Sequence, residues 1–287
     1  MRVLRTAAEL FACRKAMAEE ADVGVVLTMG NLHQGHLSLL AESLQNHPTT
    51  FFTIFVNPKQ FAPHEDFDRY PRTLEKDLEL IREVYERSCK QLVIFAPSSI
   101  EEVFPPGYDS VISVGKLTRG LCGKSRPGHF DGVTTVVERL FAMIKPRVAY
   151  FGQKDYQQFL VIKKMVCDLL LDIDVRSMPI VRDDDGLALS SRNSYLTSEE
   201  RKHALVLAQT LQKISEMVAA GDVARAKAVA REVIASDNRW EYLEILDGES
   251  LQEVADGQSS EKVAVLGALR LRKTRLIDNV VLVIGGV

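Results

Sequence analysis

Two histidines three residues apart, His33 and His36, are the side chains whose spacing points most directly to chemistry. Before them, the apolar, β-branched run Val23–Leu27 is broken by Gly30, and an apolar segment with helical spacing follows. This pattern predicts a buried strand, a glycine turn and a helix that begins near His33. Imidazoles three positions apart in a first helical turn share a face, where they can donate hydrogen bonds to phosphate oxygens. Backbone N–H groups at the helix start favour an anion as well. The alternative is a strand–turn–helix whose histidines are purely structural.

Neutral amides and basic side chains occur in two loops that could contact a small ligand. Asn57 and Gln60 follow the apolar run Thr49–Val56, in a polar loop over residues 57–73. A long loop after a parallel strand is where α/β proteins keep ligand-contacting groups. Arg126 lies in the Gly/Pro-containing stretch SRPGHF and could close over an anion. Ordinary turns and surface loops are the alternative for both stretches.

A lysine and an aspartate directly follow the apolar run Val148–Phe151, in the stretch GQKDYQQ. Lys154 is a mobile point charge that can follow a phosphate through a reaction. Asp155 could orient a substrate or simply cap the following helix. Gln158 lies four residues beyond Lys154 and would point to the same helical face.

Hydroxyl groups stand beside a guanidinium in Ser190-Ser191-Arg192, a combination suited to phosphate oxygens. Just before them, Asp183-Asp184-Asp185 resembles a metal-binding run. Because the run precedes a glycine in a polar turn, a solvated loop is the favoured interpretation.

Strands and helices must alternate to position these groups. Strands are expected over 23–27, 49–56, 92–95, 111–114, 148–151 and 175–181, and helices over 5–20, from 33 onward, 74–87, 133–144 and 156–171. This alternation predicts an α/β fold with a Rossmann-like, doubly wound parallel sheet. Helical patterns over 197–219 and 223–236 precede strand-like runs over 242–246, 263–271 and 280–284, which predicts a smaller C-terminal α+β domain.

The composition is that of an ordinary globular protein. Of 287 residues, 46% are hydrophobic and 26% are charged, and the net charge is −3. No global basic field favours nucleic acid, no apolar run approaches a membrane span, and the N-terminus lacks the apolar core of a signal peptide. Four cysteines without a paired spacing indicate free thiols in a reducing compartment. We therefore expect a cytoplasmic protein that binds neither nucleic acid nor membrane.

Five stretches together resemble the successive signature motifs of the pantothenate synthetase (pantoate–β-alanine ligase) family, within the HIGH-type nucleotidyltransferase superfamily. They are TMGNLHQGH, FVNPKQF with DFDRYPRT, SRPGHFDGV, FGQKDYQQ and DGLALSSRNSYL, in the family's order and spacing over residues 20–200. Two positions depart from the usual pattern, with Leu27 in place of proline and Leu189 in place of methionine.

The resemblance implies a homodimeric, cytoplasmic enzyme that uses ATP and Mg²⁺. It implies a Rossmann-like ATP- and pantoate-binding domain over residues 1–180, and a smaller domain over 181–287 that closes over the active site. His36 matches the position of the catalytic proton donor, and His33 and Lys154 are the other expected catalytic residues. The expected ATP contacts are Met29, Gly30, Asn31, Leu32, His33, Gln34, Gly35, His36, Gly152, Gln153, Lys154, Asp155, Val181, Leu189, Ser190, Ser191 and Arg192.

Pantoate and β-alanine are expected at Gln60 and Gln158, with Asn57 and Arg126 as further contacts. Mg²⁺ is expected mainly on the ATP phosphates, with Asp77 as a candidate protein ligand. The implied reaction condenses (R)-pantoate with β-alanine through pantoyl adenylate and releases AMP and pyrophosphate. A nucleotidyltransferase of the same superfamily and a nucleotide-binding regulator that has lost catalysis are the alternatives. A tRNA synthetase fragment is disfavoured because no anticodon-binding domain or basic surface is evident.

Overall fold

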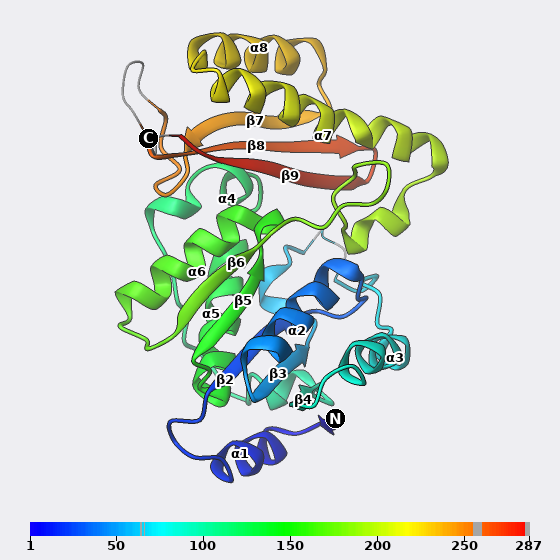
Figure 1. Ribbon diagram of the computed structural model, residues 1–287, viewed down its shortest axis with the longest axis vertical. Coiled ribbons are helices and arrows are strands. Elements are labelled where there is room, and N and C mark those ends of the chain that lie inside the picture. Colours follow the sequence, from blue (N-terminus) through cyan, green and yellow to red (C-terminus); the bar gives the residue numbers. More distant parts are fainter. Residues whose placement is uncertain (64, 66, 255–259, 285–287) are drawn as a thin grey trace. The chain divides into compact units, whose positions relative to one another are not determined.

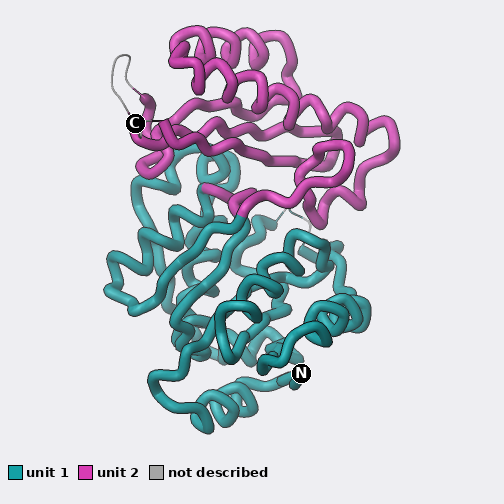
Figure 2. Tube along the Cα trace, viewed as in Figure 1, with its two compact units in different colours: residues 1–152, 157–178 teal, residues 153–156, 179–287 magenta. Residues whose placement is uncertain are grey.

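The computed structural model describes residues 1–63, 65, 67–254 and 260–284. The chain divides into two compact units, coloured separately in Figure 2. The first unit comprises Met1–Gly152 and Gln157–Met178, and the second comprises Gln153–Tyr156 and Pro179–Val287. The short segment Gln153–Tyr156 therefore belongs with the C-terminal part of the chain, although it follows a strand of the first unit directly.

A six-stranded parallel sheet forms the first unit, in the order β1-β4-β3-β2-β5-β6 (Figure 1). Its strands are β1 (Arg2–Leu4), β2 (Val23–Thr28), β3 (Thr49–Ile54), β4 (Gln91–Phe95), β5 (Val148–Gly152) and β6 (Asp174–Met178). From β2 the chain proceeds to β3 and β4 on one side, and it then crosses to β5 and β6 on the other. This confirms the predicted doubly wound α/β fold. In such sheets ligands bind at the carboxyl edge where the strand order reverses, which here is between β2 and β5.

Helices connect these strands. They are α1 (Ala7–Lys15), α2 (Gln34–Asn46), α3 (Leu74–Tyr85), α4 (Leu121–Ser125), α5 (His129–Ile144) and α6 (Tyr156–Asp168). Short 3₁₀ turns occur at η1 (Pro58–Gln60), η2 (Ile100–Glu102), η3 (Lys116–Thr118), η4 (Gln153–Asp155) and η5 (Ser191–Tyr195). Apolar side chains of α2 and α3, such as Leu40 and Ile81, pack with Val26, Phe52 and Ile94 of the sheet. This packing fixes the start of α2 against the carboxyl ends of the strands.

Two predicted elements of the first unit differ from the structure. The helix expected over 5–20 ends at Lys15, and the Arg14 guanidinium donates to the carbonyls of Ala18 and Glu19, which holds the following residues in a turn. The strand expected over 111–114 is absent. Its Ile112 backbone instead bonds to hydroxyl groups of Thr134 and Thr135 on α5.

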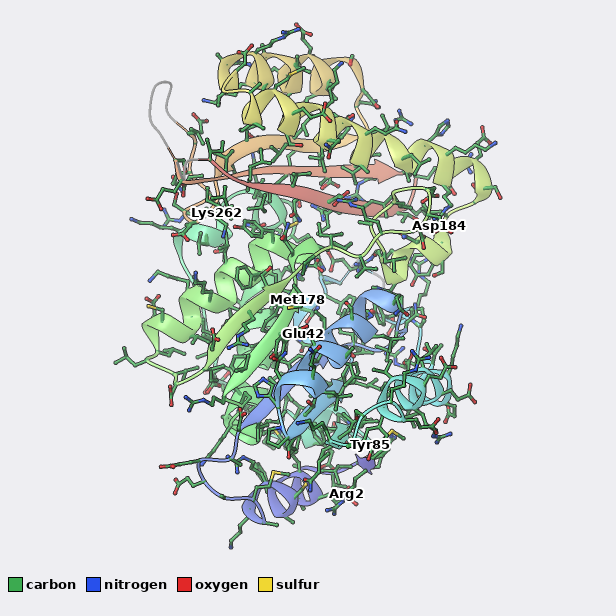
Figure 3. The ribbon with its side chains drawn as sticks, viewed as in Figure 1. Arg2, Glu42, Tyr85, Met178, Asp184 and Lys262 are labelled. Atoms are coloured by element: carbon green, nitrogen blue, oxygen red, sulfur yellow. The ribbon has the colours of Figure 1, made fainter. Side chains whose placement is uncertain are left out.

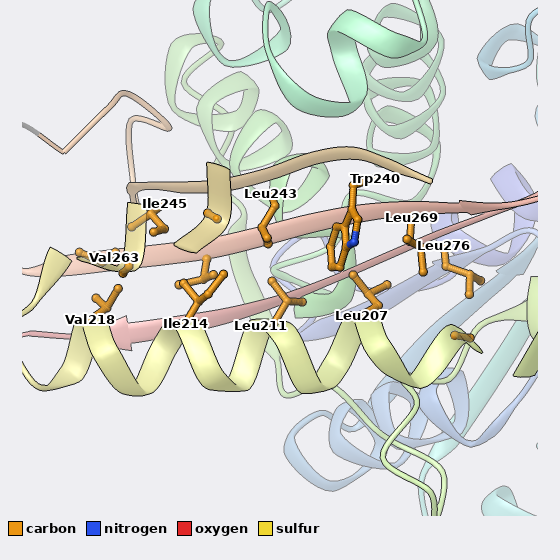
Figure 4. Close-up of a cluster of buried hydrophobic side chains, with 14 of the residues drawn as sticks. Leu207, Leu211, Ile214, Val218, Trp240, Leu243, Ile245, Val263, Leu269 and Leu276 are labelled. Atoms are coloured by element: carbon orange, nitrogen blue, oxygen red, sulfur yellow. The ribbon is translucent and has the colours of Figure 1, made fainter. Parts of the chain in front are cut away.

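An antiparallel sheet in the order β7-β8-β9 forms the second unit together with two helices. The elements are α7 (Ser198–Ala219), α8 (Val223–Ser236), β7 (Trp240–Asp247), β8 (Lys262–Leu271) and β9 (Thr274–Val283). Leu207, Leu211, Ile214 and Val218 follow the helical repeat of α7 and pack on the sheet beside Trp240 (Figure 4). The smaller α+β part is thus confirmed, although its last strand begins six residues before the predicted start.

The carboxylate of Asp247 organises the turn that follows β7. It accepts hydrogen bonds from the Ser250 N–H at 2.7 Å, the Ser250 hydroxyl at 2.7 Å, the Glu249 N–H at 3.1 Å and the Ser260 hydroxyl. Burial acts to raise the pKa of Asp247, but these donors outweigh it and lower the pKa to about 2.

Asp247 should therefore contribute stability that is present above its unfolded pKa and is lost as the pH falls toward 2. Asp247→Asn is expected to lower the free energy of unfolding at pH 7. The difference in the free energy of unfolding between the variant and the unsubstituted protein should fall to roughly half of its pH 7 value by pH 3. Urea unfolding of both proteins from pH 7 to pH 3 measures this. A difference that does not change with pH would assign the effect to something other than the charge.

Among the described residues, no helix combines the length and apolar character that crossing a membrane requires.

Candidate active site

The turn after β2 has a backbone that few residues adopt. Gly30 and Asn31 both have positive φ angles, of 82° and 49°. A Cβ atom at Gly30 would lie 3.0 Å from a carboxylate oxygen of Asp77 and 3.1 Å from Ile54. The positive φ therefore favours glycine at position 30, and a Cβ atom there would require its neighbours to shift. The turn brings the chain from the end of β2 directly into α2.

Asp77 of α3 holds this turn in place. Its side chain is buried, and its two oxygens accept the N–H groups of Asn31 at 3.0 Å and Leu32 at 2.9 Å. The Thr73 hydroxyl lies 3.2 Å from both oxygens. With both oxygens engaged by backbone donors, Asp77 is suited to positioning the turn and not to binding Mg²⁺ directly.

His33 and His36 cap the start of α2 with their Nδ1 atoms. His33 is the N-cap residue, and its Nδ1 accepts the N–H of Gly35 at 3.2 Å. The Nδ1 of His36 accepts the N–H of His33 at 3.4 Å, which completes a reciprocal capping box. The two ring centroids are 4.0 Å apart. Because an acceptor Nδ1 carries no proton, each neutral imidazole has its proton on Nε2, an atom that can act as a hydrogen-bond donor.

Asp77→Asn tests the positioning role of that carboxylate. An amide has one oxygen where the turn needs two acceptors, so the variant should lose about 1–3 kcal/mol of stability. Glu75→Gln is the matched control, since Glu75 is an exposed carboxylate in the same helical turn, and it should stay within about 0.5 kcal/mol of the unsubstituted protein. Urea unfolding measures both. A changed Mg²⁺ requirement with unchanged stability would make Asp77 a metal ligand instead.

Asn57 and Gln60 are held together in the turn η1. The buried Asn57 amide donates to the Gln60 Oε1 and to the Gly132 carbonyl on α5, both at 3.0 Å. The Asn57 Oδ1 accepts the N–H of Lys59 at 3.2 Å. A Cβ atom at Gly132 would lie only 2.1 Å from the Lys59 carbonyl oxygen. The close packing of α5 against η1 therefore depends on the absence of a side chain at Gly132. Gln60 is thereby fixed to the helix behind it.

Arg126 lies in the same cluster and is bonded to a carboxylate. Its guanidinium donates to both oxygens of Glu65, at 2.6 and 2.7 Å, and to the Nε2 of His129 at 2.9 Å. The His129 Nδ1 lies 2.8 Å from the Gln60 carbonyl oxygen, to which it donates. Burial acts to raise the pKa of Glu65, but hydrogen bonds and charge from Arg126 keep it below the usual value. Arg126 therefore supports the Gln60 backbone in this structure.

Gln158 is half-buried in the first turns of α6. Its neighbour Gln157 is buried and bonds to the N–H of Cys122 and the carbonyls of Leu117 and Gly120. The start of α6 is thus tied to the loop that precedes α4.

Lys154 and its neighbours form the turn η4 in the second unit. The Lys154 Nζ lies 3.9 Å from the Asp155 carboxylate, and its side chain is 19% exposed. The carbonyls of Gln153 and Lys154 both accept the side-chain amide of Asn279 on β9, at 2.9 Å each. The backbone of this turn is therefore fixed from the C-terminal sheet.

Val181 and Leu189 pair with each other in a short hairpin, where the Leu189 N–H donates to the Val181 carbonyl at 3.0 Å. The hairpin leads into Ser190, the N-cap of η5, whose hydroxyl accepts the N–H of Arg192 at 3.3 Å. Ser191 and Arg192 thus stand at the start of a short 3₁₀ turn.

The three aspartates before this turn lie in the hairpin, and two of them connect it to α7. Asp183 and Asp185 both bond to Arg201 of α7, at 2.6 and 2.8 Å, and Asp184 lies at the hairpin's tip (Figure 3). Across the described part of the chain, no three His, Cys, Asp or Glu side chains are grouped to hold a metal ion.

Within the first unit, the fold brings several predicted site residues to one edge. The turn from Met29 to His36 follows β2, the Asn57–Gln60 turn follows β3, and Gly152 is the last residue of β5. The carboxyl ends of these strands share the same edge of the parallel sheet. Within the second unit, the Lys154 turn and the hairpin before Ser190 both bond to β9.

The residues that hold these groups in place were not among those predicted from the sequence. Glu65, Gly132, Arg182, Asp278 and Asn279 support the site by contacts over 61 to 126 positions along the chain. For Asp278 and Asn279 the sequence signal is a polar pair directly before the apolar run VVLVI.

Comparisons with known proteins show which family the chain belongs to. The family model described as pantoate-beta-alanine ligase matches residues 2–281. The chain belongs to the pantoate-beta-alanine ligase family. It is therefore an enzyme of the class that joins an acid to an amino acid through a C–N bond, as the resemblance in the sequence predicted.

Relatives match this ligase family member over almost its whole length. Pantothenate synthetase of Acetivibrio thermocellus is 45% identical over 287 residues, covering 98% of this chain and 99% of the relative. A crystal structure of pantothenate synthetase from Thermus thermophilus has a TM-score of 0.88 at 43% identity, with 98% and 99% coverage. Pantoate-beta-alanine ligase from Francisella tularensis, complexed with beta-gamma ATP and beta-alanine, has a TM-score of 0.76 at 28% identity, covering 98% and 97%.

Proposed function

We propose that this protein condenses (R)-pantoate with β-alanine to form pantothenate, with ATP as co-substrate. In the first step a carboxylate oxygen of pantoate attacks the α-phosphorus of ATP. The bond from that phosphorus to the bridging oxygen breaks, so pyrophosphate leaves and pantoyl adenylate forms. In the second step the β-alanine nitrogen attacks the acyl carbon, the carbon–oxygen bond to the adenylate breaks, AMP leaves and the amine loses a proton.

The observation that carries this proposal is the pair of imidazoles at the start of α2. Their Nδ1 atoms are engaged as caps, which places both donor protons on Nε2 beside the N-terminus of a helix. Two Nε2–H donors and the helix dipole stabilise negative charge that develops on phosphate oxygens as pyrophosphate departs. Phosphoryl transfer needs chiefly positioning and charge neutralisation, which these groups can supply.

The remaining residues are assigned by their chemistry. Lys154 follows the phosphates as a positive charge, and Ser190, Ser191 and Arg192 offer hydroxyl and guanidinium donors to phosphate oxygens. The other ATP contacts proposed are Met29, Gly30, Asn31, Leu32, Gln34, Gly35, Gly152, Gln153, Asp155, Val181 and Leu189. We assign pantoate and β-alanine to Gln60 and Gln158. Asn57, expected as a further contact, is buried and bonded within the protein, and we assign it to holding Gln60 in place. Arg126 supports Gln60 through His129, while its charge is paired with Glu65.

Mg²⁺ fits this site through ATP and not through a protein cage. Mg²⁺ commonly retains water and binds substrate phosphates with few protein ligands, and Asp77 is engaged by backbone donors. Bound in this way, Mg²⁺ would neutralise phosphate charge. We further propose that the enzyme is a cytoplasmic homodimer, and that residues 181–287 form the domain that closes over the active site.

Pyrophosphate release from ATP and Mg²⁺, measured with pantoate alone and with β-alanine added, tests the function. Pantoate-dependent release, followed by AMP and pantothenate once β-alanine is present, is the expected result. A nucleotide-linked product would favour the nucleotidyltransferase alternative. ATP binding without turnover on any substrate would indicate a regulator.

A further inference from the structure

We propose that two adjacent residues of β9, Asp278 and Asn279, are positioning residues that fix the Lys154 turn and the hairpin before Ser190 at the same time. This inference rests on the proposed function, because it takes Lys154 and Ser190–Arg192 as the phosphate contacts. Asp278 and Asn279 themselves touch backbone and side chains of those segments, so their effect is exerted through them.

Asn279 fixes the Lys154 turn with both hydrogens of its side-chain amide. They donate to the carbonyls of Gln153 and Lys154, at 2.9 Å each, and the Gln153 amide returns a longer bond of 3.4 Å to the Asn279 oxygen. The Asn279 side chain is buried, with 2% of its surface exposed. Two successive carbonyls held by one rigid planar amide leave the peptide planes on either side of Lys154 little freedom.

Asp278 fixes the hairpin through Arg182. The guanidinium of Arg182 donates to both carboxylate oxygens of Asp278, at 2.7 and 3.0 Å, and to the Gly186 carbonyl at 3.1 Å. Arg182 is itself bridged to Ala188 across the hairpin. A bidentate arginine–carboxylate pair fixes orientation as well as distance. The pair therefore sets the direction in which the chain leaves Ala188 toward Ser190.

One strand can make both contacts because consecutive side chains on a strand point to opposite faces of the sheet. Asp278 also accepts the N–H of Asn279 at 2.8 Å, which joins the two groups. An aspartate–asparagine pair buried between the apolar residues of β9 is costly unless both groups are satisfied. Here each is satisfied by a segment that carries a proposed phosphate contact.

Asn279→Asp and Asn279→Ala test the first contact. An ionised carboxylate has no hydrogen to donate to two carbonyls, and alanine has no polar group, so both variants should release the turn. We expect kcat for pantoate-dependent pyrophosphate release to fall at least about 10-fold in both, with KM for β-alanine unchanged. Asn238→Asp, which makes the same chemical change at an exposed position, should keep the unsubstituted kcat.

Comparison of the two variants separates positioning from charge. Loss of activity in Asn279→Asp alone would assign the effect to a carboxylate near Lys154 and would overturn the proposal.

Arg182→Gln and Arg182→Lys test the second contact at a less buried position. Arg182→Gln should lower kcat several-fold, while Arg182→Lys, which retains one charged donor, should recover part of it. Full activity in Arg182→Gln would overturn that half of the proposal.

Hydrogen–deuterium exchange provides a readout that does not depend on turnover. Amides of residues 153–156 should exchange faster in the Asn279 variants, and those of residues 187–193 in Arg182→Gln, with the rest of the chain unchanged. Unchanged exchange in these segments would overturn the positioning roles. If the unsubstituted protein releases no pyrophosphate with pantoate, the proposed function fails, while exchange still decides whether β9 fixes the two segments.

Discussion

His36→Ala is expected to lower pantoate-dependent pyrophosphate release by about 10²- to 10³-fold, the loss that follows removal of one donor to a developing oxyanion. The His36 Nε2–H is that donor, because the Nδ1 atom is occupied by the N–H of His33. The proposed chemistry needs the donor only as negative charge grows on phosphate, so KM for ATP should change much less than kcat.

His33→Asn is the matched variant that separates capping from catalysis. Asparagine is a strong N-cap residue, so the start of α2 and the free energy of unfolding should be retained within about 0.5 kcal/mol. Turnover should still fall, since asparagine is shorter and cannot place a donor where the His33 Nε2 stands. His33→Ala loses the cap as well and should cost about 1 kcal/mol of stability. Near-normal turnover in His36→Ala or His33→Asn would remove that imidazole from the mechanism.

Gly132→Ala is expected to be the most disruptive small substitution near the pantoate residues. The added methyl group would meet the Lys59 carbonyl oxygen at 2.1 Å and the Gln60 nitrogen at 2.6 Å, and both belong to backbone that cannot rotate away. Forcing α5 and η1 apart should cost about 1–3 kcal/mol of stability. It should also raise KM for pantoate, because the shift breaks the bond between the Asn57 amide and the Gly132 carbonyl that positions Gln60.

Gly115→Ala is the control for this substitution. A Cβ atom there meets nothing within 4 Å, and the backbone φ of −71° suits alanine. Stability and KM should match those of the unsubstituted protein. Urea unfolding and steady-state kinetics with varied pantoate measure both variants. A Gly132→Ala protein with unchanged stability would mean that α5 and η1 do not approach as closely as the structure has them.

Local sequence was sufficient for the elements that carry the site. The β-branched apolar run determines the strand over 23–28. Helix α2 begins directly after its N-cap residue His33, because the residues that cap it are adjacent in the chain. Alternation of such elements limits the fold to a doubly wound sheet, since parallel strands require crossover helices. The motifs then indicated the family, which the comparisons confirmed over residues 2–281.

Tertiary structure decided what holds those elements. The helix expected over 5–20 ends at Lys15, where Arg14 bonds to the carbonyls of the turn that follows. The strand expected over 111–114 does not form, because threonine hydroxyls on α5 bond to the backbone of Ile112. Whether Asp77 would bind a metal or position the turn after β2 depended on donors 45 and 46 residues away. Spacing along the chain specifies local periodicity, but a buried polar group takes its role from the partners that folding brings to it, and those partners are distant in sequence.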